Sequence, residues 1–302
     1  MSSRLNSVFQ RLKKCLALNE VTGLDIGYRL ENGEHTNELA VRIHTEGGCS
    51  KTLTSFTGKE KNVQFIQGEF NLSTGALHAP VMNPITVERR KIIQPGISVG
   101  TFDCGTLGLI CNDDLSSSLG FLTCYHVIDG IKGDAVTQPA PGIDGGNFSR
   151  DKIGTLERFL SYAVHYDAAF VKLNGTRETL STQIISNVLV QPPKPIALND
   201  MVVKVGRTTG YTEGKVTAQG FYPIVYPGHG RKLINGWLVE SLNNEKTSDV
   251  GDSGAVWYDR TTLHGKGLQF ATGTNKISSL MAPLIDVMRL LKISPYYNNP
   301  PL

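Results

Sequence analysis

Short apolar runs separated by turn-forming residues are the feature that most constrains the fold of this chain. From Gly96 onward, runs rich in Val, Leu, Phe and Tyr recur between clusters of Gly, Pro and Asp. Runs of this length and composition are typical of β-strands, and their regular spacing predicts a sandwich or barrels. The runs are Thr106–Ile110, Gly120–Tyr125, Ala168–Leu173, Met201–Val205, Leu238–Leu242, Ala255–Tyr258 and Gly267–Ala271.

The segments on either side of this β-rich stretch have different patterns. Two alternating runs, at 23–30 and 39–44, flank a Gly-containing turn and predict a hairpin. A helix is predicted before the hairpin by the spacing of Leu5, Val8, Phe9, Leu12 and Leu16. We therefore expect residues 1–90 to form an N-terminal α/β region, regulatory or for assembly, whose helix packs on its own hairpin. Apolar spacing over 280–293 predicts a C-terminal helix.

Charge and cysteine content exclude several classes of function. The 30 Lys and Arg residues exceed the 27 Asp and Glu residues by only three, and they are spread along the chain, so no nucleic-acid partner is expected. No run is long enough to predict a membrane span. Five cysteines without a CxxC pair fit neither a zinc knuckle nor a disulfide framework. Because no export signal is recognisable either, we expect a reducing, cytoplasmic location.

The sequence Gly251-Asp252-Ser253-Gly254 is the first candidate for chemistry. A nucleophilic serine needs a sharp turn that presents its hydroxyl, with backbone N–H groups nearby for the developing oxyanion. Glycines on both sides permit such a turn, which we expect to be exposed. Taken alone, however, the same four residues also fit an ordinary turn.

Two further positions change this balance. His126 follows the apolar run that ends at Tyr125, and Asp167 directly precedes the run Ala168–Leu173. Either residue alone would be interpreted as structural. Together with Ser253 they occur in the order His, Asp, Ser, which is the order of the chymotrypsin arrangement and differs from subtilisin and the α/β-hydrolases.

At these positions the chain resembles the trypsin/chymotrypsin-type serine peptidases. Leu122-Thr-Cys-Tyr-His is similar to the family's Leu-Thr-Ala-Ala-His, Tyr166-Asp-Ala-Ala-Phe-Val-Lys-Leu to its Asn-Asp-Ile-Ala-Leu-Leu-Lys-Leu, and Gly-Asp-Ser-Gly is identical. A narrower likeness is to the non-secreted branch that includes the plant narrow-leaf peptidase and bacterial relatives. It rests on Pro95-Gly-Ile-Ser, Gly105-Thr-Leu-Gly, Gln138-Pro-Ala-Pro-Gly-Ile-Asp-Gly-Gly and Val205-Gly-Arg-Thr-Thr-Gly-Tyr-Thr-Glu-Gly.

The resemblance implies a mainly β fold with two six-stranded antiparallel β-barrels in a protease domain over 91–302. Barrel one would span about 96–173, a linker about 174–195, barrel two about 196–279, and the C-terminal helix about 280–293. The catalytic site would lie in the cleft between the barrels.

The resemblance also implies roles for individual residues in a serine endopeptidase. Ser253 would be the nucleophile, His126 the general base and acid, and Asp167 the group that orients the imidazole. The N–H groups of Gly251 and Ser253 would form the oxyanion hole. Thr247, six residues before the nucleophile, would lie at the base of the substrate pocket and predicts small or medium apolar residues there, although nearby Asp249 leaves this choice open. No cofactor or metal is implied, and the partner would be a protein or peptide substrate.

Several alternatives stay open. A catalytically silent scaffold of the same fold would bind a peptide or partner protein, whereas an esterase would need Gly-x-Ser-x-Gly. Arg207 is interpreted as a brace for its turn in preference to an anion site, and a metal at His165 and Asp167 is a minor alternative. Cleavage before Ile92 could supply an amine for Asp252, but an internal Arg or Lys, or a backbone N–H, is the favoured partner. A homo-oligomer is also left open.

Overall fold

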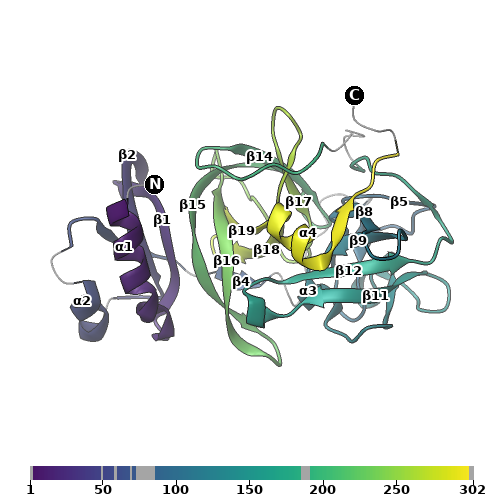
Figure 1. Ribbon diagram of the computed structural model, residues 1–302, viewed down its shortest axis with the longest axis horizontal. Helices are drawn as coiled ribbons and strands as arrows, with labels where there is room; N and C mark the ends of the chain where they lie inside the picture. Colours follow the sequence, from purple (N-terminus) through teal and green to yellow (C-terminus); the bar gives the residue numbers. More distant parts are fainter. Residues whose placement is uncertain are drawn as a thin grey trace.

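The computed structural model describes residues 3–48, 50–57, 60–68, 70–72, 86–184 and 191–298. These residues form an N-terminal layer and two β units. Along the long axis of the molecule, the layer lies at one end, the β unit built from the later strands lies next to it, and the β unit built from the earlier strands lies at the far end (Figure 1).

The earlier β unit is a six-stranded antiparallel sheet. Its strand order is β10-β11-β12-β9-β8-β20, so the C-terminal strand of the chain completes the sheet that the central segment builds. The strands are β8 (Leu109–Asp113), β9 (Leu119–Thr123), β10 (Ala135–Thr137), β11 (Lys152–Leu160), β12 (Ala168–Leu173) and β20 (Ile293–Pro295).

The later β unit is a closed barrel. Six antiparallel strands follow the order β14-β17-β18-β19-β16-β15, and β14 also pairs with β15 to close the ring. They are β14 (Met201–Gly206), β15 (Gly210–Tyr226), β16 (Gly230–Glu240), β17 (Val256–Asp259), β18 (Gly265–Gly273) and β19 (Ser278–Pro283). Two six-stranded units and a mainly β chain agree with the fold class predicted from the sequence.

The C-terminal helix is shorter than predicted. Residues 278–283 form β19, which pairs with both β16 and β18, so the helix α4 begins at Leu284 and ends at Leu291. The apolar residues Leu280 and Met281 fit either a buried strand or a helix, and pairing on both sides selects the strand. Among the described residues, no helix is long and apolar enough to cross a membrane.

Short elements lie before and within the earlier β unit and in the expected linker between the units. Within the expected linker, β13 pairs in parallel with β5, and residues 185–190 of that linker lie outside the described residues. The short elements are β5 (Ile92–Ile93), β6 (Ser98–Val99), β7 (Gly105–Thr106), α3 (Tyr125–Ile128), η4 (Gly142–Asp144), η5 (Tyr162–Val164) and β13 (Glu178–Thr179).

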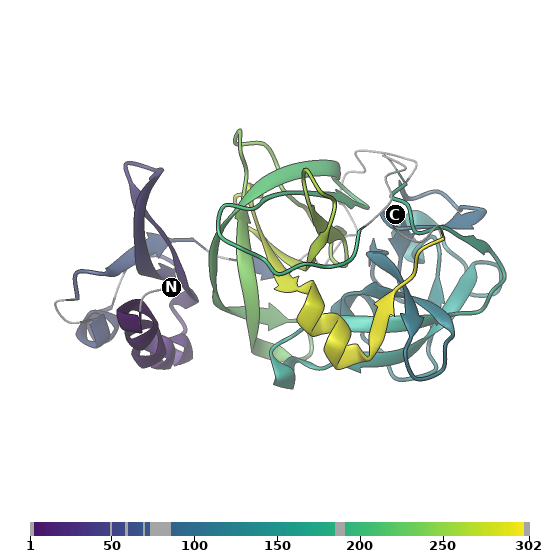
Figure 2. The ribbon, with the colours of Figure 1, turned by 45° about the horizontal axis from the view of Figure 1, so that its top comes forward.

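The N-terminal layer extends the sheet of the closed barrel. Strand β1 pairs with β15, β2 with β1, and β3 in parallel with β2, so one sheet runs from barrel to layer (Figure 2). Gly220 permits the junction, because a Cβ there would come within 2.1 Å of the Leu24 carbonyl oxygen. The elements are α1 (Ser3–Leu12), η1 (Lys13–Ala17), β1 (Val21–Glu31), β2 (Glu34–Thr45), α2 (Lys51–Thr57), β3 (Val63–Gln67) and β4 (Phe70–Leu72).

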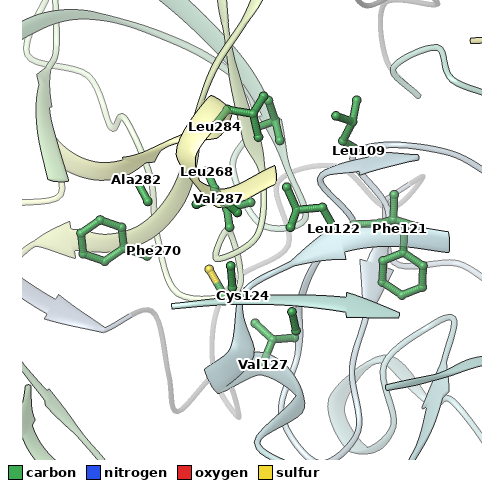
Figure 3. Close-up of a cluster of buried hydrophobic side chains, with 14 of the residues drawn as sticks. Leu109, Phe121, Leu122, Cys124, Val127, Leu268, Phe270, Ala282, Leu284 and Val287 are labelled. Atoms are coloured by element: carbon green, nitrogen blue, oxygen red, sulfur yellow. The ribbon is translucent and has the colours of Figure 1, made fainter. Parts of the chain in front are cut away.

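Two apolar cores hold these parts together. The helix α1 packs on β1 and β2 as expected, burying Leu5, Val8 and Leu12 against the hairpin. The main core is continuous between the two β units, and Figure 3 shows side chains such as Leu122 and Cys124 from one unit close to Leu268 of the other and Val287 of α4. This shared core fixes the position of the loops that lie between the units.

Candidate active site

His126 and Asp167 meet at the ends of neighbouring strands. Strand β9 ends at Thr123, and the single helical turn α3 then carries His126, so the histidine lies on a helix instead of at the end of a strand. Asp167 lies directly before β12, which pairs with β9. The backbone N–H of His126 donates to Asp167 Oδ1 over 3.0 Å, and His126 Nδ1 hydrogen-bonds Asp167 Oδ2. This arrangement leaves His126 Nε2 available for proton transfer.

Ser253 lies in the loop between β16 and β17, and it is buried. The expectation of an exposed turn is therefore wrong: the Ser253 side chain has no exposed surface, and His126 is 7% exposed. The reason is the position of the loop between the two β units, where the N–H of Thr106 donates to the Ser253 carbonyl over 2.7 Å. Within the described residues, neither Ser253 Oγ nor His126 Nε2 has a hydrogen-bond partner.

The loop also orients two backbone N–H groups. Gly251 has φ +95°, a conformation that favours glycine. Thr208 Oγ1 donates to the Val250 carbonyl, and Ala255 N–H donates to the Asp252 carbonyl. Because the C=O and N–H of a trans peptide point in opposite directions, the N–H groups of Gly251 and Ser253 point away from these contacts. The two N–H groups that the resemblance assigns to an oxyanion hole are thus free of these two contacts.

Thr106 of β7 connects the earlier β unit to this loop. Its hydroxyl donates to the Gly251 carbonyl and accepts from the backbone N–H of Arg207, each over 2.9 Å. Arg207 is fully buried, and its guanidinium binds the Asp144 carboxylate of the other β unit as well as Thr208 Oγ1. Arg207 therefore acts as the predicted brace, whereas nothing in the sequence pointed to Asp144 or Thr106 as its neighbours.

Asp252 has a complete set of internal partners. Lys204 Nζ lies 3.1 Å from Asp252 Oδ2, and the backbone N–H groups of Thr208 and Thr209 donate to Oδ1 over 2.8 and 3.1 Å. Burial lowers the pKa of Lys204, against the opposing effect of Asp252. Ile92, the candidate new terminus, lies instead in β5 and pairs with Glu178 of β13. The favoured prediction of an internal lysine and backbone donors agrees with this geometry.

Tyr226 is a member of the site that sequence reasoning missed. Its hydroxyl donates to Asp167 Oδ2 over 3.0 Å from the end of the long strand β15. Burial and the nearby Asp167 carboxylate raise the pKa of Tyr226 well above its ordinary value, so the phenol remains a donor. The only signal in the sequence is a tyrosine at an apolar position of an alternating strand, which equally fits a core residue.

The predicted pocket residue Thr247 lies in a cluster of hydroxyl groups. Ser279 Oγ donates to Thr247 Oγ1 over 2.7 Å, and Ser248 contacts both Ser279 and Thr272. Asp249, the alternative, is held by Lys246 and Lys276 at 3.1 and 3.0 Å. Burial opposes ionisation of Asp249, but the two lysines and the N–H of Val250 lower its pKa. The region around Thr247 thus contains hydroxyl groups that bond one another and the Asp249 carboxylate, whose charge two lysines neutralise.

Potential metal ligands near the triad have other partners. His165 Nδ1 bonds the Leu233 carbonyl, so His165 does not share a site with Asp167. Ligand atoms of Cys124, His126 and Asp167 lie within 4.8 Å of one another. Burial, and then Asp167, raise the pKa of Cys124 well above its ordinary value, and the thiol donates to the Gln269 carbonyl over 3.0 Å. In this structure the Cys124 thiol is thus engaged as a hydrogen-bond donor, and His126 and Asp167 are bonded to each other.

Comparisons with known proteins identify the fold. Neither a family model nor a curated relative matches the sequence. Among solved structures, Thermobifida fusca protease A is similar with a TM-score of 0.52 and 17% identity over 68% of this chain and 100% of its own. A Nocardiopsis protease has a TM-score of 0.50 and 16% identity over 68% of this chain and 98% of its own. A serine protease described as specific for glutamic acid has a TM-score of 0.52 and 15% identity over 68% and 100%.

The chain therefore has the fold of the trypsin/chymotrypsin-type serine peptidases, as its motifs predicted. The similarity is one of structure, and the narrower likeness to the non-secreted branch stays a prediction.

Proposed function

We propose that this chain is a serine endopeptidase that uses His126, Asp167 and Ser253 as its catalytic triad. The observation that carries the proposal is the pairing of His126 Nδ1 with Asp167, in a chain whose His126 Nε2 and Ser253 Oγ are both buried and unpartnered among the described residues. A structural histidine in a protein core normally has both ring nitrogens bonded.

The chemistry follows from the positions of the donors. His126 Nε2 removes the proton of Ser253 as its oxygen attacks the peptide carbonyl, and then protonates the leaving amine. The N–H groups of Gly251 and Ser253 stabilise the oxyanion, and each such donor is worth roughly 3–4 kcal/mol of barrier. Water then hydrolyses the acyl-enzyme by the same steps. The chemistry requires neither a cofactor nor a metal.

The proposed pocket around Thr247 favours small or medium apolar side chains. Its hydroxyl groups bond one another, and Asp249 is occupied by two lysines, so no free carboxylate is available to pair with Arg or Lys. Profiling with a peptide library tests this proposal, and a dominant preference for Arg or Lys would contradict it.

A fluorophosphonate probe tests activity directly. We expect the wild-type chain to be labelled at Ser253, and Ser253→Ala to be unlabelled while keeping the thermal stability of the wild type. Labelling together with hydrolysis of a protein substrate would support the endopeptidase. A folded chain that is not labelled would identify the alternative, a silent scaffold that binds a peptide or partner protein.

Location and assembly belong to the same proposal. Four cysteines (Cys15, Cys104, Cys111 and Cys124) are free thiols, which supports a reducing, cytoplasmic compartment. The division at about residue 90 and a homo-oligomer stay predictions, which size-exclusion measurements of the full chain and of residues 91–302 test.

A further inference from the structure

On one side of strand β18, the neighbouring barrel strand pairs with only part of its length. On that side β17 pairs with Gly265, Gly267 and Leu268 and then ends, while β18 continues to Gly273. On the other side β19 pairs with β18 as far as Thr272. The segment Ala271–Gly273 therefore offers a free edge beyond β17, and a strand edge of this kind accepts an extended peptide as an additional strand.

This edge begins next to the nucleophile. The N–H of Gly254 donates to the Gln269 carbonyl over 2.9 Å, and the N–H of Gln269 donates to the Ala255 carbonyl over 2.8 Å. Ser253 is therefore adjacent to Gln269, two residues before Ala271. A peptide paired along Ala271–Gly273 would have one end directed at Ser253.

The chain's own strand β4 is paired at this position. Its register is Leu72 opposite Ala271, Asn71 opposite Thr272 and Phe70 opposite Gly273, in the antiparallel sense. Because the strands are antiparallel, the carboxyl end of β4 is the end nearer to Ser253. Residues on the acyl side of a scissile bond run in this direction, from their amino end towards the attacked carbonyl.

Phe70 fixes β4 to the N-terminal layer. Its ring centroid lies 5.0 Å from that of Tyr222 and 5.5 Å from that of His44, in edge-on contacts. Both partners bind the buried Asp25 carboxylate, so their rings are held in place. Such aromatic pairs contribute about 0.5–1.5 kcal/mol beyond the burial of their area.

We infer that β4 is an autoinhibitory strand: it occupies in cis the edge Ala271–Gly273 of β18, along which an extended peptide would pair, and it must leave before a peptide binds. The inference rests on the proposed endopeptidase function. The partner it predicts is an extended peptide of uncharged side chains.

A reversible disulfide between the paired strands tests the inference. Leu72→Cys/Ala271→Cys places two thiols at directly opposed positions, within the Cα separation that a disulfide spans. Oxidation should slow hydrolysis of a fluorogenic peptide with four uncharged residues before the scissile bond by at least about tenfold, and reduction should restore it. Labelling by diisopropyl fluorophosphate, which needs no peptide strand, should not change. The single variant Leu72→Cys under the same oxidant is the control.

A second variant weakens the attachment of β4 without a crosslink. Phe70→Ala should lower the KM for the same peptide by about tenfold and leave kcat unchanged, because the competent state becomes more populated. Phe65→Ala removes a half-exposed ring from β3 of the same layer and is the matched control. The inference would be overturned if protein that is labelled at Ser253 hydrolysed the peptide equally well with and without the disulfide, and with and without Phe70→Ala. If Ser253 is never labelled, the endopeptidase proposal has failed, but the inference about β4 can still be tested. The test is then the binding of the fluorescent peptide to Ser253→Ala, measured with and without Phe70→Ala.

Discussion

Two buried aspartates of this molecule have nearly the same neighbours and very different surroundings. Asp167 accepts hydrogen bonds from His126 and from Tyr226, and Asp25 from His44 and from Tyr222. Both tyrosines belong to β15, four residues apart and on the same face of the strand. The molecule therefore contains two tyrosine–aspartate–histidine clusters, one between the β units and one beneath the N-terminal layer.

The clusters differ in charge balance and in the free nitrogen of the histidine. Arg42 donates to both oxygens of Asp25, at 2.7 and 3.1 Å, so that carboxylate has a permanent counter-charge. Asp167 has no arginine or lysine partner among the described residues, and His126 binds it through Nδ1, which leaves Nε2 without a partner among those residues. Asp25 therefore has a permanent cation beside it whatever the charge of His44, whereas the basic partner of Asp167 among the described residues is His126. Under the proposed function, the comparison predicts a role in stability for Asp25 and a role in catalysis for Asp167.

Among the proposed substitutions, those of the two histidines should give the largest difference in turnover between the clusters. By analogy with other triads, His126→Ala should lower turnover by about 10⁶-fold, because the base and the nucleophile act as one unit. His44→Ala should leave the triad intact and change turnover far less. Peptide hydrolysis by both variants at equal folded concentration measures the difference, and near-normal activity of His126→Ala would remove the triad assignment.

The two aspartates should differ next. Asp167→Asn should reduce turnover by roughly 10⁴-fold, because an amide cannot hold the imidazole in the required tautomer. The substitution should not alter how the substrate binds beside Ser253, so KM should change little. Steady-state kinetics on Asp167→Asn and Asp25→Asn side by side make the test, and equal losses of kcat would show that the two clusters are not functionally distinct.

Stability should show the opposite ranking. Asp25→Asn leaves the fully buried Arg42 without its counter-charge and should lower the free energy of unfolding by about 3–5 kcal/mol. Glu38→Gln removes the carboxylate of an exposed pair with Arg29 and should cost less than about 1 kcal/mol. Denaturant unfolding of the two variants provides the comparison.

The same variant has a signature in acid. Burial alone would raise the pKa of Asp25, but Arg42 and His44 outweigh burial and hold it well below its ordinary value. Since the folded-state pKa is depressed, the stabilisation is complete above the unfolded value of about 3.9 and is lost as pH falls below it. Unfolding free energy of the wild type should therefore fall more steeply below pH 4 than that of Asp25→Asn.

The tyrosines give the smallest expected difference. Tyr226→Phe removes a hydrogen bond to the catalytic carboxylate, which is worth about 1.5–3 kcal/mol, and should lower kcat by about tenfold or more. Tyr222→Phe removes the matching bond to Asp25 and should lower stability with little change in kcat. Similar kinetic effects of both substitutions would contradict the separation of the clusters.

The sequence predicted the parts of the site that depend on local order. His126, Asp167 and Ser253 each end or begin a strand-like run, and their chain order carries the arrangement of the triad. Burial of Ser253 was not predictable, because it depends on Thr106 and other residues far away in the chain. Likewise, the tip of β15 reaches Asp167 only because β15 is much longer than its apolar alternation indicates.

The buried ion pairs left a weaker signal. Lys204 interrupts the apolar run Met201–Val205, and Arg42 interrupts Leu39–Ile43. A charged residue inside an apolar strand indicates a buried partner of opposite charge, but many carboxylates in the chain could be that partner. Only the register of β1 on β2 selects Asp25 for Arg42, and only the path of the loop before β17 brings Asp252 to Lys204.

Strand β15 belongs at once to the closed barrel and to the N-terminal layer, since it pairs with β14, β16 and β1. Separating the layer from the barrel therefore breaks ladder hydrogen bonds and uncovers apolar residues on both sides of the junction. The two parts should lose their structure in one cooperative transition, and the amides of Ala218 to Phe221 should exchange with solvent only through that global opening.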